Sequence, residues 1–453
     1  MLLLPPRGLA GGHRLDRVRA ISLASGLLTL LALMPAVTVI GQPPTADADR
    51  LERRIEVLSR VGRTAEGGVS RLAYSDADTA GRRYVIGFMK ELGLSVRIDA
   101  AGNIFARRPG RNDELPPILF GSHLDTVPNG GKYDGPAGVL TALEVVQLLE
   151  RHDIVTRHPL EVVVFAAEEA GQIGAKAFAG VLAADELKQK AQAGITIGQG
   201  MARLGGNPDN IESAAVAHGD YSAYLELHVE QGSVLADAGR DIGVVQGIVG
   251  ISRWHVSVTG TANHAGTTPM DKRRDALVTA AKIVLAVNRI IRESEGRQVG
   301  TIGRIRAFPG APNVVPGRVE MMLEIRDLSS ERIAGFFDRI RGAAEELAES
   351  DGTLVAFDPS GIVPRKPAAT DPRLREIIAA AAEGRGYRFL RMPSGAGHDA
   401  QTVSLVAPIG MIFVPSQKGI SHAPEEFTSK EDLAKGANIL ISTVLAVDRA
   451  FHR

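Results

Sequence analysis

Seven histidine and acidic side chains in this sequence stand in short polar motifs that end or follow apolar runs. The motifs are HLD (His123, Asp125), YDG (Asp134), AAEE (Glu168, Glu169), ELHVEQ (His228) and ISHAPEE (His422). Taken singly, each motif is weak, because a histidine at a strand end is more often structural and an Asp before Gly is usually a turn residue. Taken together, three His and several carboxylates are the ligand set that a metal site without cysteine requires.

The number of these residues fits a site for two metal ions. Two divalent ions about 3.5–4 Å apart need a bridging carboxylate and terminal ligands on each ion. Asp134 could bridge, and the remaining ligands would be His123, Glu169, His228 and His422. Asp125 lies two residues from His123 on the same strand face, where it could orient that imidazole. Glu168 then has no ligand role, so it is the candidate general base that takes a proton from water and passes it to a leaving nitrogen.

The composition excludes several other kinds of site. The chain has 453 residues, no cysteine, and 52 Lys+Arg against 52 Asp+Glu. Without cysteine there is no disulfide framework, thiol nucleophile or Cys-ligated metal. A zero formal charge argues against nucleic-acid binding, because neutralising phosphates needs a basic surplus. The length leaves room for two or three domains.

From about residue 50 onward, strands and helices alternate in the way that is typical of an α/β fold. Strands are predicted within 116–127 and at 160–165, 224–232 and 408–416, and a helix is predicted at 136–152. In open α/β sheets, ligands bind outside the carboxyl ends of the strands. Most of the reactive residues stand at these four strand ends, so we expect the site at that edge of the sheet.

A different pattern appears between about residues 247 and 364. Four strands (ISRWHVSVTG, TIGRIRAF, GRVEMMLEIRD and TLVAF) and two amphipathic helices (273–294 and about 329–349) are predicted there. Two helices against four strands make a compact α+β layer. We therefore expect one domain built from residues 50–246 and 365–453, with 247–364 inserted as a second domain.

The first 41 residues have the pattern of a signal peptide. Four arginines within the first 20 residues precede an uncharged, mainly apolar stretch at 21–41, and small residues stand before a cleavage site at Gln42. The prediction is a periplasmic or secreted protein, or a membrane-anchored one if the segment stays uncleaved.

Taken in order, seven segments resemble the family of N-carbamoyl-L-amino-acid hydrolases and allantoate amidohydrolases, a branch of the di-metal aminoacylase and carboxypeptidase superfamily. The segments are GSHLDTVPNGGKYDG, FAAEEAG, ELHVEQG, GTANHAGTTPMDKRRDAL, APNVVPGRVEMMLEIRD, MPSGAGHDA and VPSQKGISHAPEE. HVEQG and NHAGTTPM are the most specific of them. The fold that the resemblance implies is a di-metal hydrolase domain with a mixed central sheet flanked by helices, plus an inserted α+β lid and dimerisation domain.

The resemblance also assigns roles to the metal-site residues. In that family, two Zn, Mn, Co or Ni ions are bound by the residues that match His123, Asp134, Glu169, His228 and His422. The residue matching Asp134 bridges the ions, and Glu168 matches the catalytic base. Peptidase relatives have a carboxylate where this chain has His228, which indicates the carbamoylase branch.

Four further residues match positions that contact the substrate. His264 matches a lid histidine that reaches across a homodimer and polarises the substrate carbonyl, a suitable place for a donor to the developing oxyanion. Asn313 and Arg326 match residues that hold the substrate carboxylate, and Gln231 matches one that contacts the substrate near the metals. Alone, His264 would be interpreted as a turn cap. Strand alternation puts Arg326 on a polar strand face, where a surface arginine is the competing interpretation.

The resemblance implies a metal-dependent amidohydrolase that cleaves the carbamoyl C–N bond of N-carbamoyl-L-amino acids or of ureido acids such as allantoate. An aminoacylase or dipeptidase of the same superfamily is the alternative. A non-catalytic binding protein is disfavoured, because every expected ligand and the base are present. The sequence departs from the family after the Glu pair, where EEAGQIGAKAF lacks the usual Arg-Phe step, so Gln172 and Lys176 are candidates for shaping the substrate pocket.

Overall fold

The largest element of the fold is a nine-stranded mixed sheet, seen in a computed structural model that describes residues 44–359 and 364–451. Its strand order is β1-β2-β4-β3-β5-β15-β6-β13, and β14 pairs with β6. The strands are β1 (Ser95–Ile98), β2 (Ile104–Arg108), β3 (Ile118–His123), β4 (Leu160–Phe165), β5 (Ala223–Val229), β6 (Ile242–Ile248), β13 (Ala368–Ala369), β14 (Phe389–Ser394) and β15 (Ile409–Val414). The central strands β4, β3, β5 and β15 are parallel to one another, whereas β2 and β6 join them antiparallel. The predicted α/β class is confirmed.

The central strands are apolar on both faces because helices cover both faces of the sheet. Alternate residues enter different cores: Ile118 and Phe120 belong to one buried cluster, and Leu119, between them, belongs to the other. The first face is covered by α1 (Ala48–Ser59), α2 (Asp76–Glu91), α3 (Pro136–Arg151), α9 (Pro372–Gly384) and α11 (Lys430–Ala450). The second face is covered by α4 (Ile173–Phe178) and α10 (Asp399–Val403). Shorter helices are α5 (Ile197–Arg203) and α6 (Val234–Asp237).

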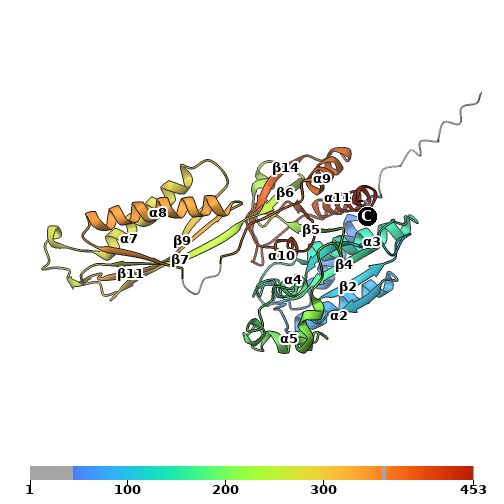
Figure 1. Ribbon diagram of the computed structural model, residues 1–453, viewed down its shortest axis with the longest axis horizontal. Helices are drawn as coiled ribbons and strands as arrows, with labels where there is room; N and C mark the ends of the chain where they lie inside the picture. The colour runs from blue at the N-terminus through green and yellow to red at the C-terminus, as the bar shows by residue number, and fades with distance from the viewer. Residues whose placement is uncertain (1–43, 360–363, 452–453) are drawn as a thin grey trace, which may run out of the picture. The chain divides into compact units, whose positions relative to one another are not determined.

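A separate four-stranded antiparallel sheet occupies much of the 250–358 segment. Its order is β12-β7-β11-β9, with β7 (Gly250–Thr259), β9 (Val299–Phe308), β11 (Arg318–Asp327) and β12 (Leu354–Asp358). Helices α7 (Ala276–Arg292) and α8 (Ser330–Ser350) lie along one face of it (Figure 1). In β11, Leu323 and Ile325 are buried against these helices, while Glu324 and Arg326 point to the other face. This sheet therefore has one covered face and one open polar face.

A two-stranded ribbon of β8 (Asn263–His264) and β10 (Val314–Val315) accompanies this sheet. The signal peptide expected at 1–41 lies outside the described residues. Within the described ranges, no helix has the length and apolar character needed to cross a membrane.

Candidate metal centre and active-site pocket

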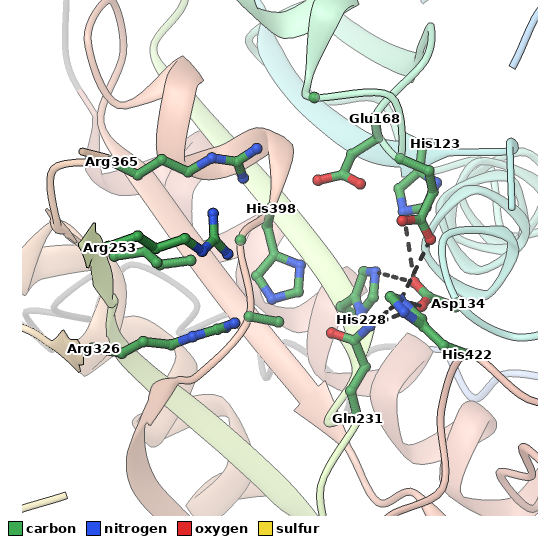
Figure 2. A pocket seen from close by; sticks show the side chains of 15 residues that line it. His123, Asp134, Glu168, His228, Gln231, Arg253, Arg326, Arg365, His398 and His422 are labelled. Atoms are coloured by element: carbon green, nitrogen blue, oxygen red, sulfur yellow. Dashed lines mark hydrogen bonds and ion pairs between the residues drawn. The ribbon is translucent and has the colours of Figure 1, made fainter. Parts of the chain in front are cut away.

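The predicted strand ends meet at one edge of the nine-stranded sheet and line a cavity of about 240 Å³ (Figure 2). His123 is the last residue of β3 and His228 is the next to last of β5. Glu168 and Glu169 follow β4, and His422 follows β15. All five side chains line the cavity. The parallel pairing of the four strands is what brings these distant segments together.

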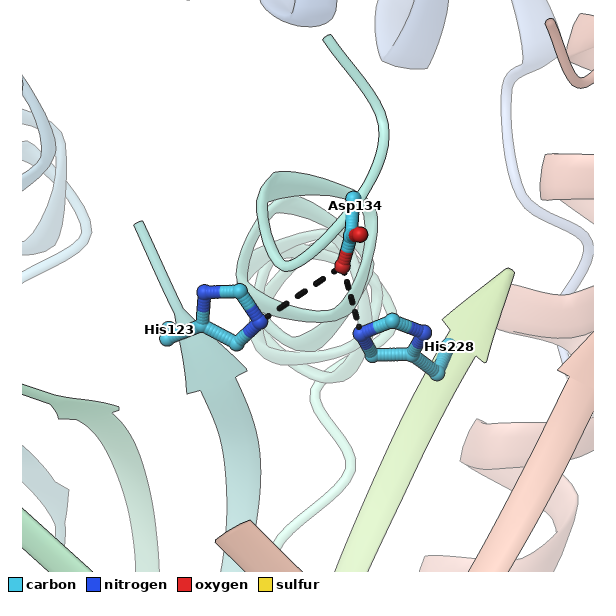
Figure 3. Close-up of side chains that lie close together, drawn as sticks. All are labelled: His123, Asp134 and His228. Carbon is cyan, nitrogen blue, oxygen red and sulfur yellow. Dashed lines mark ion pairs between the residues drawn. The ribbon is translucent and has the colours of Figure 1, made fainter. Parts of the chain in front are cut away.

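The carboxylate of Asp134 stands at the centre of the cluster. Its Oδ1 lies 3.1 Å from His228 Nε2 and 3.7 Å from His123 Nε2 (Figure 3). Its Oδ2 lies 3.0 Å from His422 Nε2, which is in turn 3.5 Å from Glu169 Oε1. Asp134 therefore belongs to two groups of three possible metal ligands, one with His123 and His228 and one with Glu169 and His422.

Local backbone geometry fixes Asp134 at this point. The next residue, Gly135, has φ 81°, and a Cβ there would lie 2.5 Å from the His123 ring. Only glycine both adopts this conformation readily and leaves room for the imidazole. Pro136 then begins α3 at its first turn, where its missing N–H costs no hydrogen bond.

Glu426 anchors the same point from the far end of the chain. Its Oε1 accepts hydrogen bonds from the backbone N–H groups of Tyr133 (2.8 Å) and Asp134 (3.0 Å), and its Oε2 accepts one from Ser421 Oγ at 2.7 Å. One buried carboxylate thus holds both Asp134 and the residue before His422. Sequence reasoning misses this residue, because an acidic pair after a proline resembles a solvated turn.

Main-chain carbonyls set the orientation of two imidazoles. His123 Nδ1 lies 3.0 Å from the carbonyl oxygen of Asp125, and His228 Nδ1 lies 2.9 Å from that of Val229. Because a carbonyl only accepts, each Nδ1 carries a proton, which leaves Nε2 as the atom that is directed at Asp134 and that would bind a cation. His228 Nε2 is buried and forms no hydrogen bond of good geometry, which is the condition expected of a metal ligand.

Asp125 acts on the glutamate pair through its carboxylate. Oδ1 accepts from the N–H of Glu168 at 3.2 Å and Oδ2 accepts from that of Glu169 at 3.0 Å. From the sequence we expect Asp125 to orient His123, and it does so through its carbonyl oxygen, since its Oδ1 is 3.7 Å from His123 Nδ1. Ala167, before the pair, has φ 57°, a strained value for a residue with a Cβ. The turn that presents the two glutamates is therefore held from the end of strand β3.

The acids of the site perturb one another strongly. Burial raises the pKa of Glu168 to about 7, and burial together with the Asp134 carboxylate raises the pKa of Glu169. Burial would also raise the pKa of Asp134, but the imidazoles of His228 and His422 hold it well below its usual range. Despite its own burial, the pKa of His228 is raised to about 9 by Asp134. A buried site that draws protons in this way is electrostatically suited to a cation.

A third group of possible ligands consists of Glu226, His228 and His398. Glu226 already accepts hydrogen bonds from Ser122 Oγ (2.9 Å) and from the N–H of Ala400 (3.0 Å). His398 Nε2 lies 2.8 Å from Ser394 Oγ, and its ring packs edge-on against that of His228 at 4.5 Å between centroids. His398 therefore packs against the His228 ring, and Glu226 links the end of β3 to the start of α10.

The predicted substrate residues fall into two sets. Gln231 lines the pocket, and its Nε2 donates to Asp134 Oδ2 at 2.8 Å. Arg326 also lines the pocket, and its Nη1 donates to the carbonyl oxygen of Gly395 at 2.7 Å. By contrast, His264 and Asn313 are exposed on the β8–β10 ribbon and are absent from the described residues that line the pocket. His264 Nδ1 accepts from the N–H of Gly266 at 3.0 Å.

Two arginines of the pocket were not among the predicted site residues, and the predicted neighbours Gln172 and Lys176 do not line it. Arg253 and Arg365 line the pocket beside Arg326. The signal for Arg253 is its place in the alternating strand ISRWHVSVTG, whereas the sequence gives no signal for Arg365. Gln172 is buried and donates through Nε2 to the carbonyl oxygen of His398 at 2.8 Å. Lys176 pairs with Glu186 at 2.6 Å and does not line the described pocket.

Comparison with known proteins gives a consistent set of relatives. Residues 119–446 match the model of Peptidase family M20/M25/M40. The chain is 40% identical over 401 residues to an N-carbamoyl-L-amino acid amidohydrolase of Geobacillus stearothermophilus, covering 87% of this chain and 97% of the relative. It is 34% identical over 392 residues to an allantoate amidohydrolase of Bacillus subtilis, covering 85% and 94%. A crystal structure of an amidase of the hydantoinase/carbamoylase family from Burkholderia multivorans superposes with a TM-score of 0.84 at 37% identity, covering 89% and 98%.

Proposed function

This chain belongs to Peptidase family M20/M25/M40 and, within it, to the group of N-carbamoyl-L-amino-acid amidohydrolases, and from that premise we propose that it is a metal-dependent amidohydrolase of ureido acids. Membership confirms the resemblance found in the sequence motifs. The proposed reaction is hydrolysis of the carbamoyl C–N bond of N-carbamoyl-L-amino acids, or of related ureido acids such as allantoate. The observation that carries the proposal is the position of Asp134, which belongs to two groups of possible metal ligands. Glu168 lines the same pocket but belongs to neither group.

The residues of the cluster fit two divalent ions. One ion would be held by His123, Asp134 and His228, and the other by Asp134, Glu169 and His422, with Asp134 common to both. Such ions supply Lewis-acid polarisation of the scissile carbonyl and make water easier to deprotonate. Imidazole and carboxylate ligands suit Zn, Mn, Co or Ni, and we propose one of these as the native metal.

Glu168 is the proposed general base. It is half-buried and lines the pocket, and among the described side chains only Gln172 donates a hydrogen bond to it, from Nε2 to Oε1 at 3.4 Å. Burial raises the pKa of this carboxylate, which is the direction expected of a group that takes up a proton and returns it. Glu168 would take a proton from the attacking water and deliver it to the nitrogen that leaves. The products of a carbamoyl amino acid are then the free amino acid, carbon dioxide and ammonia.

Arg326 and Gln231 are proposed to orient the substrate. A guanidinium fork binds a carboxylate with two parallel hydrogen bonds, so Arg326 suits the α-carboxylate of the substrate. Gln231 Oε1 is buried without a partner, although its Nε2 is engaged by Asp134. That free acceptor is available to an N–H of the ureido group.

We propose that a second copy of the chain completes the site. His264 and Asn313 lie together on the β8–β10 ribbon, outside the described pocket of their own chain. In a homodimer, with residues 247–364 as lid and dimerisation domain, these two side chains would serve the partner's substrate. His264 would donate to the developing oxyanion and Asn313 would hold the carboxylate.

The N-terminal segment leads to a proposal about location. Residues 1–41 have the charge and hydropathy pattern of a signal peptide, so the enzyme is proposed to act in the periplasm or outside the cell. Detection of the mature N-terminus in a fractionated cell tests this.

Ammonia release tests the function. The purified protein is dialysed free of metal, reloaded with Mn, Co or Zn, and given N-carbamoyl amino acids and allantoate. N-acetyl amino acids and dipeptides are followed in parallel by amine release. We expect metal-dependent turnover of a ureido acid. Turnover of acyl or peptide substrates alone would overturn the proposal in favour of an aminoacylase or dipeptidase.

A further inference from the structure

Three arginines form one wall of the pocket. Arg253, Arg326 and Arg365 extend toward the cavity from the side opposite the His123–Asp134–His228 cluster (Figure 2). We call these three residues the arginine wall. Arg326 alone is enough for one substrate carboxylate, so the other two guanidinium groups call for a separate explanation.

The register of the chain puts the three side chains on one face. Arg326 of β11 pairs with Ile251 of β7, and Arg365 pairs with Ile251 from the other side through two backbone hydrogen bonds of 2.9 Å. Directly opposed residues in an antiparallel pair point to the same face. Arg253 lies two residues from Ile251 and therefore points the same way. The arginine wall thus lies on the open face of the four-stranded sheet, which is the face away from α7 and α8.

One carboxylate neutralises part of this charge. Glu324 Oε2 pairs with Arg253 at 2.6 Å and Glu324 Oε1 pairs with Arg326 at 2.7 Å. Although burial would raise the pKa of Glu324, the two arginines hold it below its usual value, so Glu324 is charged at neutral pH. Three guanidinium groups against one carboxylate leave an excess of two positive charges on this wall.

Arg365 is the arginine with free donors. No described residue forms an ion pair or hydrogen bond with its guanidinium group, whereas Arg253 and Arg326 both have Glu324. The guanidinium lies next to Gly397, where an added Cβ would come within 2.9 Å of Arg365 Nη1. The glycine therefore leaves the space that the guanidinium occupies at the pocket wall. Across the cavity, Asp134 and Glu169 belong to the proposed metal groups, whereas Glu168 belongs to neither group and forms no ion pair with Arg365 (Figure 2).

We propose that the substrate carries a second carboxylate on its side chain and that Arg365 binds this group. The inference rests on the proposed function, in which Arg326 takes the α-carboxylate. Arg253 lies between Arg326 and Arg365 and adds positive charge there (Figure 2). The substrate class is then a ureido acid with two carboxylates, of the size of a carbamoylated acidic amino acid. A guanidinium that meets a neutral amide donates to one carbonyl oxygen and forms no ion pair, whereas a carboxylate offers it a negative charge and two acceptor oxygens, so the wall favours the acid over the amide.

Pairs of substrates that differ only in this charge test the proposal. N-carbamoyl-aspartate is compared with N-carbamoyl-asparagine, and N-carbamoyl-glutamate with N-carbamoyl-glutamine, by kcat/KM on the metal-loaded enzyme. We expect the acid of each pair to be favoured by about 10- to 100-fold, the range of one charge-assisted hydrogen bond. Equal values, or a preference for the amides, would overturn the proposal.

Arg365→Gln locates the effect. It should raise KM for the two acids by about 10- to 100-fold, change kcat little, and leave the amides almost unaffected. Arg339→Gln is the matched control, since Arg339 is an exposed arginine on α8 outside the pocket, and it should keep the acid preference. An equal loss for acids and amides in Arg365→Gln would show a general structural role and contradict the assignment.

Binding without turnover separates this inference from the proposed function. Calorimetric titration of the Glu168→Gln protein with N-carbamoyl-aspartate and N-carbamoyl-asparagine should show tighter binding of the acid. Adding Arg365→Gln to this protein should abolish the difference in affinity between acid and amide. Preferential binding of the acid, with no hydrolysis of any ureido compound by the wild-type enzyme, would contradict the proposed function and support the arginine assignment. Hydrolysis of ureido compounds with equal binding of acid and amide would support the proposed function and contradict the arginine assignment.

Discussion

The two walls of the pocket are built in opposite ways. The cluster around Asp134 lies at the edge of the nine-stranded sheet and consists mostly of buried side chains. Main-chain carbonyls hold His123 and His228, and the carboxylates of Asp125 and Glu426 hold the backbone of Glu168, Glu169 and Asp134. The arginine wall consists of partly exposed side chains on the open face of the four-stranded sheet, and a single glutamate holds two of them. We infer that the first wall performs the chemistry and the second selects the substrate.

The difference concerns how much of the fold each wall depends on. A change at Asp134, Asp125 or Glu426 disturbs hydrogen bonds between segments as far apart as Tyr133 and Glu426. A change at Arg253 disturbs one ion pair, that with Glu324, and a change at Arg365 breaks no ion pair among the described residues. Substitutions in the first wall should therefore affect turnover or metal binding, and those in the second should affect which acid is accepted.

The largest expected effect is that of Glu168→Gln. Removing the base should lower kcat by about 10²- to 10⁴-fold, because general acid–base catalysis contributes that much. The metal content, measured by mass spectrometry of the digested protein, should stay unchanged. The matched control is the neighbouring Glu169→Gln, which should lose metal as well as activity. Retained turnover in Glu168→Gln would contradict the base assignment.

The next effect tests whether one chain contains a complete site. His264→Ala alone should lower kcat by about 10²- to 10³-fold, the typical loss of an oxyanion donor. Mixing it with Glu168→Gln after subunit exchange should restore about a quarter of the wild-type activity, because half of the dimers are mixed and each has one intact site.

Absence of restoration on mixing would place His264 in the site of its own chain or show that the protein is not a dimer. Size-exclusion chromatography with light scattering distinguishes these two outcomes.

Glu426→Gln should have a moderate effect on the first wall. The change removes charge from the residue that fixes the N–H groups of Tyr133 and Asp134, and loss of such a support typically weakens metal binding by about 10- to 100-fold. Competition with a coloured chelator measures the affinity. The control is Glu425→Gln, because Glu425 is the exposed neighbour. Equal affinities in the two variants would contradict the anchoring role.

The smallest effect is expected in the arginine wall, for Glu324→Gln. Glu324 has a pKa below its usual value when folded, so its stabilising contribution is present above the unfolded-state pKa and is lost as the pH falls through the folded-state value. At pH 7 the variant should be less stable by at most about 1 kcal/mol, since the pair is partly solvated. At about pH 3 the difference should be smaller than at pH 7, because the unfolded-state pKa of a glutamate is about 4.3 and the folded-state pKa lies below it.

Thermal unfolding at the two pH values measures this difference. Glu320→Gln on the same strand face is the control. A stability difference that grows toward acid pH would contradict the stabilising role of the charged Glu324 carboxylate.

Sequence pattern predicted the positions of most elements that carry the site. The strand expected at 160–165 is β4, and those expected at 224–232 and 408–416 are β5 and β15. β5 begins one residue earlier than expected and ends three earlier, and β15 begins one residue later and ends two earlier. Apolar runs flanked by turn signals give such strands directly. The grouping of His123, Asp134, Glu169, His228 and His422 follows from placing polar residues at the carboxyl ends of parallel strands.

What pattern could not supply was pairing between distant segments. Arg365 reaches the pocket because its segment pairs with Ile251, more than a hundred residues earlier in the chain, and nothing in the local sequence specifies that register. Glu426 supports Asp134 only because the chain returns to it after 292 residues. Asp125 was predicted as a site residue, but its two contacts were not. Its carbonyl oxygen orients His123 and its carboxylate holds the N–H of Glu168, and both depend on a backbone turn that residue types do not reveal.

The carbonyl contacts of His123 and His228 have a consequence for how this protein tolerates mutation. Both acceptors are main-chain oxygens, at Asp125 and Val229, so replacing the side chains of those two residues leaves the acceptors in place. Asp125→Asn or Asp125→Ala would loosen the glutamate turn and still leave the His123 tautomer unchanged. The backbone path therefore determines which nitrogen of each imidazole is directed at Asp134, and this orientation should survive side-chain substitution at Asp125 and Val229.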